Sequence, residues 1–89
     1  MSQFATGTSL THASAKHALD EGVRQIAAGA TEVDCAPLAQ FDSAALAVLL
    51  AWQRAAKARG ATLAILNLPP KLASLAHAYG IDSLLAERH

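Results

Sequence analysis

The segment from Phe41 to Trp52 constrains the fold more than any other part of this chain. After Phe41 it has a polar pair, Asp42-Ser43, and then nine consecutive apolar residues, Ala44 to Trp52. Asp and Ser are typical of a helix start, where their oxygens accept hydrogen bonds from the first backbone N–H groups. A surface helix normally has one apolar stripe, so a helix start that is apolar all round must be buried on several sides or contact a partner.

Glycines divide the chain into segments, because Gly29, Gly60 and Gly80 each follow a run with helical spacing. The sequence predicts helices over about 13–28 and 43–59, and a third from Pro69-Pro70 up to Gly80. The first helix has an expected inward face of Ala15, Ala18, Leu19, Gly22, Val23 and Ile26. The second has an expected stripe of Ala45, Val48, Leu49, Trp52 and Ala56. On the solvent side of the first helix, two i,i+4 ion pairs are expected among Lys16, Asp20 and Arg24.

Three segments have the character of strands. Residues 31–36 are short and β-leaning, and residues 61–66 form a nearly continuous apolar run, as in a strand central in a sheet. Residues 4–10 are expected to form one weak strand, interrupted by Gly7. Asp82 is expected to cap a final turn that holds Leu84 and Leu85.

The alternation of strands and helices predicts an α/β fold. Right-handed βαβ units give a mainly parallel sheet, here of about four strands with three to four helices in one domain, residues 1–89. The loops that follow parallel strands gather at one edge of the sheet, where ligands and partners usually bind. We expect residues 8–11, 40–43 and 67–69 to meet at this edge.

The composition excludes several classes of function. The chain has 89 residues, 53% hydrophobic and 16% charged, with a formal net charge of zero. This balance argues against disorder and against electrostatic binding of nucleic acid. The longest apolar run is much shorter than the roughly 20 residues that span a bilayer, and the N-terminus lacks the pattern of a secretory signal. We therefore expect a cytoplasmic domain without direct membrane insertion.

The sequence contains no recognisable motif for catalysis, metal binding or cofactor binding. His12 and His17, five apart on the first predicted helix, and the lone Cys35 lack the spacing of metal ligands, and Cys35 is expected to be a buried free thiol. Phosphate-binding loops of the Gly-x-Gly-x-x-Gly and Gly-x-x-x-x-Gly-Lys types are absent. Ser43 lacks the Gly-x-Ser-x-Gly elbow of an α/β-hydrolase. The sequence predicts neither an enzyme nor a cofactor.

Phe41-Asp42-Ser43 and the apolar run after it resemble the signature of STAS domains, the family of anti-sigma factor antagonists. Residues 7–11 are similar to the Gly-x-Leu-Thr element before the first helix of that family, and residues 32–34 to its central strand. The resemblance covers nearly the whole chain and implies a STAS-type sheet. It places Ser43 at the regulatory Ser/Thr position, as a possible phospho-acceptor, and Asp42 at the acid before it.

The chain departs from the family pattern in two places. The family often has a small residue and then Gly after the hydroxyl, whereas this chain has Ala44 and Ala45. The segment before Gly7 is also short, so the first strand is expected to be abbreviated or lost.

Within the family, residues 67–72, 75–81 and 84–85 are most similar to the small STAS subunit of the bacterial phospholipid-transport ABC complex, which maintains outer-membrane lipid asymmetry. That resemblance implies a non-catalytic protein that binds the cytoplasmic ATPase subunit and, through it, the permease and the lipid-binding subunit. It would lie against the inner membrane through this partner. The residues expected to bind the partner are Phe41, Asp42, Ser43, Ala44, Ala45, Leu46 and Ala47. Two alternatives stay open: an anti-sigma factor antagonist whose Ser43 is phosphorylated by an anti-sigma factor kinase, and a Ser43 that merely caps its helix.

Overall fold

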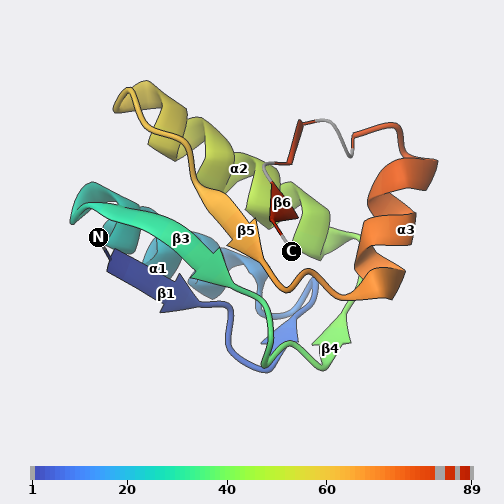
Figure 1. The fold of residues 1–89 in the computed structure, drawn as a ribbon. Helices are drawn as coiled ribbons and strands as arrows, with labels where there is room; N and C mark the ends of the chain where they lie inside the picture. Colours follow the sequence, from blue (N-terminus) through green and yellow to red (C-terminus); the bar gives the residue numbers. More distant parts are fainter. Residues whose placement is uncertain (1, 82–83, 86, 89) are drawn as a thin grey trace.

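A computed structural model describes residues 2–81, 84–85 and 87–88 of the chain. Strands and helices alternate along much of the chain, as the sequence predicts (Figure 1). In chain order the elements are β1 (Ser2–Ala5), β2 (Ser9–Leu10), α1 (Ala15–Ala27), β3 (Ala30–Asp34), β4 (Gln40–Phe41), α2 (Ala44–Ala58), β5 (Ala64–Leu66), α3 (Pro70–Ala78) and β6 (Glu87–Arg88). The three predicted helices are confirmed, each within two residues of its expected ends.

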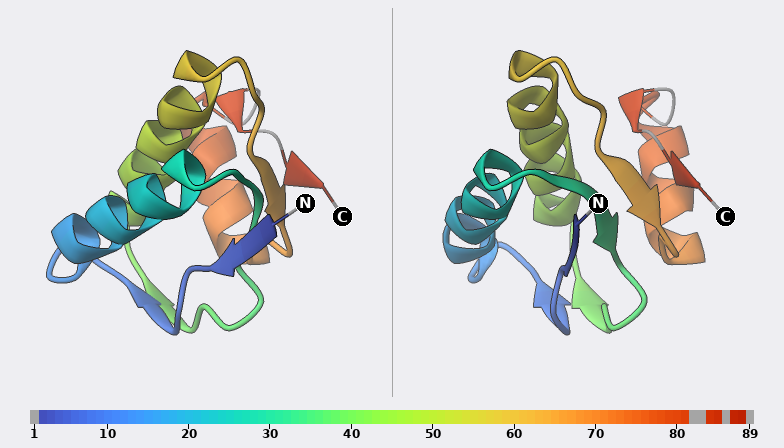
Figure 2. Two further views of the ribbon diagram at one scale, coloured as in Figure 1. Left: turned by 90° about the vertical axis from the view of Figure 1, so that its left-hand side faces the viewer. Right: turned by 60° about the vertical axis from the view of Figure 1, so that its left-hand side comes forward.

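The main sheet has four parallel strands in the order β1-β3-β5-β6, and β2 and β4 form a second parallel pair. The predicted α/β class and mainly parallel sheet are confirmed. Because each crossover steps in the same direction across the main sheet, right-handed connections place their helices on one face. Figure 2 shows α1 and α2 together on one side of the strands, and Figure 1 looks onto the opposite, uncovered side.

The core lies between the sheet and these helices. Strand register aligns Phe4, Val33 and Ile65 in one row, and Val33 and Ile65 are fully buried. The predicted stripe of α2 is confirmed, since all five of its residues are buried. α3 adds Leu72 and Ala76 to the same core.

Gly22 and Trp52 set the distance between α1 and α2. A Cβ added at Gly22 would lie 2.1 Å from Nε1 of Trp52, so the indole occupies the space that a side chain would fill. The indole N–H donates to the Leu19 carbonyl at 3.2 Å, and the Phe4 ring meets Trp52 edge-on at a centroid distance of 5.1 Å. The missing side chain of Gly22 therefore lets α1 pack directly on the largest core residue.

Two expectations about α1 are wrong. Val23 is 39% exposed rather than part of the core, because the buried line of α1 runs through Gly22 and Ile26, and the next residue is turned about 100° away. Lys16 does pair with Asp20, at 3.8 Å, but Arg24 pairs with Glu21 instead of Asp20. The i,i+3 carboxylate is also a neighbour on a helix surface, so it competes with the i,i+4 partner.

The N-terminal and third strands also differ from expectation. Residues 4–10 form two strands in different sheets, because the chain turns at Gly7, where φ is +78°. The first strand, β1, is present and pairs with β3. β5 begins only at Ala64, and residues 61–62 are exposed. Cys35 is buried and is not part of a disulfide, as predicted.

The described helices end where the sequence indicates. Gly29, Gly60 and Gly80 follow α1, α2 and α3, and each has a left-handed φ. Within the described residues no helix is both long and apolar enough to cross a membrane. The expected cap at Asp82 lies outside the described residues.

Candidate functional site

Asp42 organises the start of α2. Its Oδ1 accepts a hydrogen bond from the Ala44 backbone N–H at 2.8 Å, and its Oδ2 accepts one from the His12 backbone N–H at 3.0 Å. One carboxylate therefore joins the turn before α1 to the first turn of α2, 30 residues away in the sequence. The bond from His12, followed by the bond from Ala44, lowers the pKa of Asp42, so the group is ionised at neutral pH.

Ser43 occupies the N-cap position of α2 without capping it through its side chain. Its backbone is helical, with φ −62° and ψ −20°, and the hydroxyl makes no capping hydrogen bond. The side chain is exposed. Of the two capping residues that the sequence allows, Asp42 supplies the carboxylate cap, and this leaves the Ser43 hydroxyl open to a partner or a modifying enzyme.

The seven residues expected to bind a partner do not share one surface. Ala45 and Leu46 are 0% and 3% exposed, so they belong to the core and lie outside the surface that this domain offers. Phe41 and Ala44 are half-buried, whereas Asp42, Ser43 and Ala47 are exposed. The all-round apolar start of α2 is thus explained mainly by burial on several sides, and its surface part is small.

Ala44 and Ala47 border a hollow that the sequence does not reveal. Together with residues of α1 they line a groove of about 220 Å³, here called the α1–α2 groove. The groove is lined by Ala15, Lys16, Leu19, Ala44, Ala47 and Val48. Sequence periodicity assigns Ala15 and Leu19 to the core and Lys16 to a solvated face. The sequence signal for the groove is the set of alanines that line it, because small side chains on two facing helices leave space between the helices.

The loops expected at one edge of the sheet form two groups. Residues 8–11 and 40–43 meet: the backbone N–H groups of Ala39 and Gln40 donate to the Thr8 carbonyl, and β2 pairs with β4. Asn67, from the third loop, instead donates from Nδ2 to Oδ1 of Asp34 at 2.9 Å. The described contacts of this third loop therefore join it to the end of β3 rather than to Asp42.

The hydrogen bond between Asn67 and Asp34 joins the turn after β5 to the end of β3. Asn67 has a φ of +58°, which is uncommon for a residue with a side chain. Asp34 Oδ1 also accepts a hydrogen bond from the Ala36 backbone N–H at 2.9 Å. The Asn67 amide, and then the Ala36 N–H, lower the pKa of Asp34. The carboxylate thus holds both the turn after β3 and the turn after β5.

The histidines are also placed by the fold. His12 lies in the turn before α1, not on the helix as the sequence suggests, while His17 lies within α1. Across the described part of the chain, no three His, Cys, Asp or Glu side chains come close enough to hold a metal ion.

A parallel sheet with helices on one face, and an exposed serine after a capping aspartate at the start of a helix, define a STAS-type interaction domain. The family comparison agrees: the family model described as "Mlab, STAS domain" matches residues 5–86, so the chain belongs to the STAS family and resembles its MlaB members. STAS domains are generally non-catalytic binding domains. No curated protein and no solved structure matched the chain.

Proposed function

We propose that this domain is the MlaB-type STAS subunit of a bacterial phospholipid-transport ABC complex, and that it binds and supports the cytoplasmic ATPase subunit, MlaF. Through MlaF it would act with the permease MlaE and the lipid-binding subunit MlaD. The family match supports the type of protein. The α1–α2 groove beside Asp42 and Ser43 carries the proposal about where the ATPase docks.

The groove has the chemistry of a small protein-binding surface. Its lining is almost entirely aliphatic, and the aliphatic part of Lys16 borders it while the ammonium stays in water. Alanines keep the groove open for an apolar side chain of the partner, and Asp42 and Ser43 supply a polar rim. An apolar anchor surrounded by polar contacts is the usual arrangement at the centre of a protein interface.

Two matched variants test this surface. Ala47 and Ala58 are both exposed alanines of α2, but only Ala47 lines the groove. Ala47→Arg should weaken binding to the cognate ATPase at least about tenfold, because the arginine fills the groove with a charge that must be desolvated. Ala58→Arg should stay within about twofold of wild type. Equal binding by the wild type and Ala47→Arg, measured by titration calorimetry on variants with unchanged melting temperature, would show that the docking surface lies elsewhere.

Leu46 is unsuitable for this test. It is 3% exposed and packed in the core, so Leu46→Asp would bury an unpaired carboxylate and unfold the domain. Loss of binding by that variant would report on stability rather than on docking. Ser43→Arg remains informative, because Ser43 is exposed.

The exposed Ser43 hydroxyl supports a second candidate function, an anti-sigma factor antagonist switched by phosphorylation. A phosphate adds about −1.5 to −2 charges, which a helix N-terminus favours, but the ionised Asp42 next to it opposes them. Modification would act mainly by placing charge beside the α1–α2 groove. Intact-mass measurement of protein from its native host tests this function: a phosphorylated species that disappears in Ser43→Ala supports the switch, and none under growth or starvation contradicts it.

A further inference from the structure

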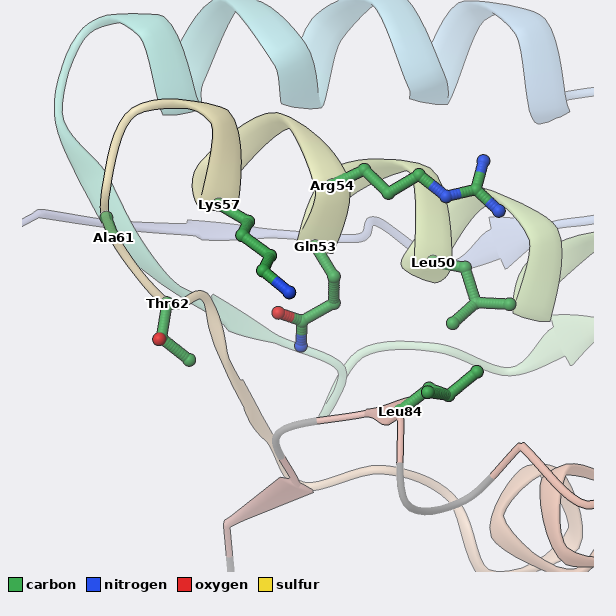
Figure 3. Close-up of a pocket in the computed structure, with 7 residues that line it drawn as sticks. All are labelled: Leu50, Gln53, Arg54, Lys57, Ala61, Thr62 and Leu84. Carbon is green, nitrogen blue, oxygen red and sulfur yellow. The ribbon is translucent and has the colours of Figure 1, made fainter.

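A larger hollow lies at the other half of α2. It has a volume of about 410 Å³ and lies between α2, the segment that leads into β5, and Leu84. Figure 3 shows Leu50, Gln53 and Lys57 on one side of it, with Thr62 and Leu84 across from them. We call it the Lys57 groove. It shares no lining residue with the α1–α2 groove, so the two are separate sites.

The Lys57 groove has an apolar end and a polar end. Leu50 and Leu84 form the apolar end, and the Leu84 side chain is 61% exposed. At the polar end, Gln53 is fixed by a hydrogen bond from its Nε2 to the Leu63 carbonyl at 2.8 Å. In Figure 3 the Lys57 side chain extends from α2 on the same side as the Gln53 side chain, and Thr62 lies on the segment that leads into β5.

The described lining of the groove carries positive charge. The described residues that line it include Lys57 and Arg54 and no carboxylate, and Lys57 forms no ion pair with any described residue. The Arg54 guanidinium points away from the Lys57 ammonium in Figure 3, so one positive charge faces the interior of the groove. The apolar surface of Leu50 and Leu84, next to a cation that no described carboxylate neutralises, matches a ligand with a hydrocarbon chain and one negative charge.

We propose that the Lys57 groove binds a single-chain amphiphile with a carboxylate head, that is, a medium-chain fatty acid anion. Lys57 supplies the point charge for the carboxylate, and the Thr62 hydroxyl and the second N–H of Gln53 can donate to its oxygens. Leu50 and Leu84 cover the methylene groups. The groove volume lies in the range of small-molecule sites, roughly 300–1,000 Å³. A folded protein partner would instead cover a surface of about 800 Å² on this domain.

Titration of the full chain with decanoate, below its micelle concentration, tests the proposal. Amide chemical shifts should move at Leu50, Gln53, Thr62 and Leu84 and stay unchanged around the α1–α2 groove. Affinity should rise with each methylene added from hexanoate to decanoate, by up to about fourfold, which is the factor for a fully buried methylene. Decyltrimethylammonium, with the same chain and the opposite charge, should not bind at this groove.

Two further variants separate the charge from the chain. Lys57→Met keeps the length of the side chain and should weaken decanoate binding about fivefold or more, while Lys71→Met, at an exposed position of α3, should stay within about twofold. Leu84→Asn should also weaken binding, and its exposure leaves the fold intact. The proposal is overturned by unchanged affinity in Lys57→Met, by equal binding of the cationic amphiphile, by shifts confined to other surfaces, or by no binding at millimolar decanoate.

Discussion

The close packing of Gly22 on Trp52 predicts that an ordinarily favourable substitution will harm this domain. Gly22 lies inside α1, where replacing Gly by Ala normally stabilises a helix by about 0.5–1 kcal/mol. In this chain the added Cβ would lie 2.1 Å from Nε1, 2.2 Å from Cε2 and 2.6 Å from Cζ2 of Trp52. The indole is 1% exposed and packed between the two helices, so either the indole or one of the helices must shift.

The expected size of the effect follows from the contacts that must change. Overpacking of a core costs about 1–3 kcal/mol. Displacing the indole also weakens its hydrogen bond to Leu19, about 1 kcal/mol, and its edge-on contact with Phe4, about 0.5–1.5 kcal/mol. After the gain in helix propensity, Gly22→Ala should lower the free energy of unfolding by about 2–4 kcal/mol. For a domain of this size that corresponds to a melting temperature lower by roughly 8 °C or more.

Urea denaturation followed by the circular dichroism of the helices measures this loss directly, and it serves equally for a variant that lacks the single tryptophan. The matched background is Trp52→Phe, which removes the indole nitrogen and the second ring. In that background Gly22→Ala should cost at least 1 kcal/mol less than in the wild type. The reasoning is refuted if Gly22→Ala is as stable as the wild type, or if its cost is the same in both backgrounds.

Other consequences concern the polar contacts. In thermal denaturation, Asp42→Ala should lower the free energy of unfolding by about 1–2 kcal/mol, because Asp42 supplies the carboxylate cap of α2. Ser43→Ala should lower it by less than about 0.5 kcal/mol, because the Ser43 hydroxyl makes no capping hydrogen bond. Equal losses in the two variants would contradict this assignment. Asn67→Gly should be about 1 kcal/mol more stable than Asn67→Ala. Both variants lose the hydrogen bond to Asp34, but only alanine is strained at a φ of +58°. Equal stability of the two variants would argue against that strain. The lowered pKa values of Asp34 and Asp42 stabilise the fold fully above their ordinary value of 3.8, and this contribution is lost as the pH falls through the lower folded values. Between about pH 5 and pH 2, urea midpoints should therefore fall further for the wild type than for the double variant Asp34→Asn/Asp42→Asn, and parallel curves would refute the linkage.

The helices were predictable because their signals are local. Helical spacing on α2 and a glycine after each helix are properties of a few neighbouring residues, and the structure keeps them. The division of residues 4–10 into β2 and the end of β1 was missed, because a two-residue strand depends on a distant partner, β4, for its hydrogen bonds. The pairing of Arg24 with Glu21 was missed for a similar reason, since two carboxylates were within reach and only geometry selected one.

The sequence by itself determined the α/β class, the parallel sheet, the helix ends and the position of Asp42 and Ser43 at a helix start. Tertiary structure alone decided which apolar residues of α2 are core and which are surface, because burial depends on what packs against each side. It placed Leu46 inside and Ala47 outside, although both belong to the same apolar run. It also brought the His12 backbone to Asp42 and left both grooves open beside α2, since these features join segments that are far apart in the chain.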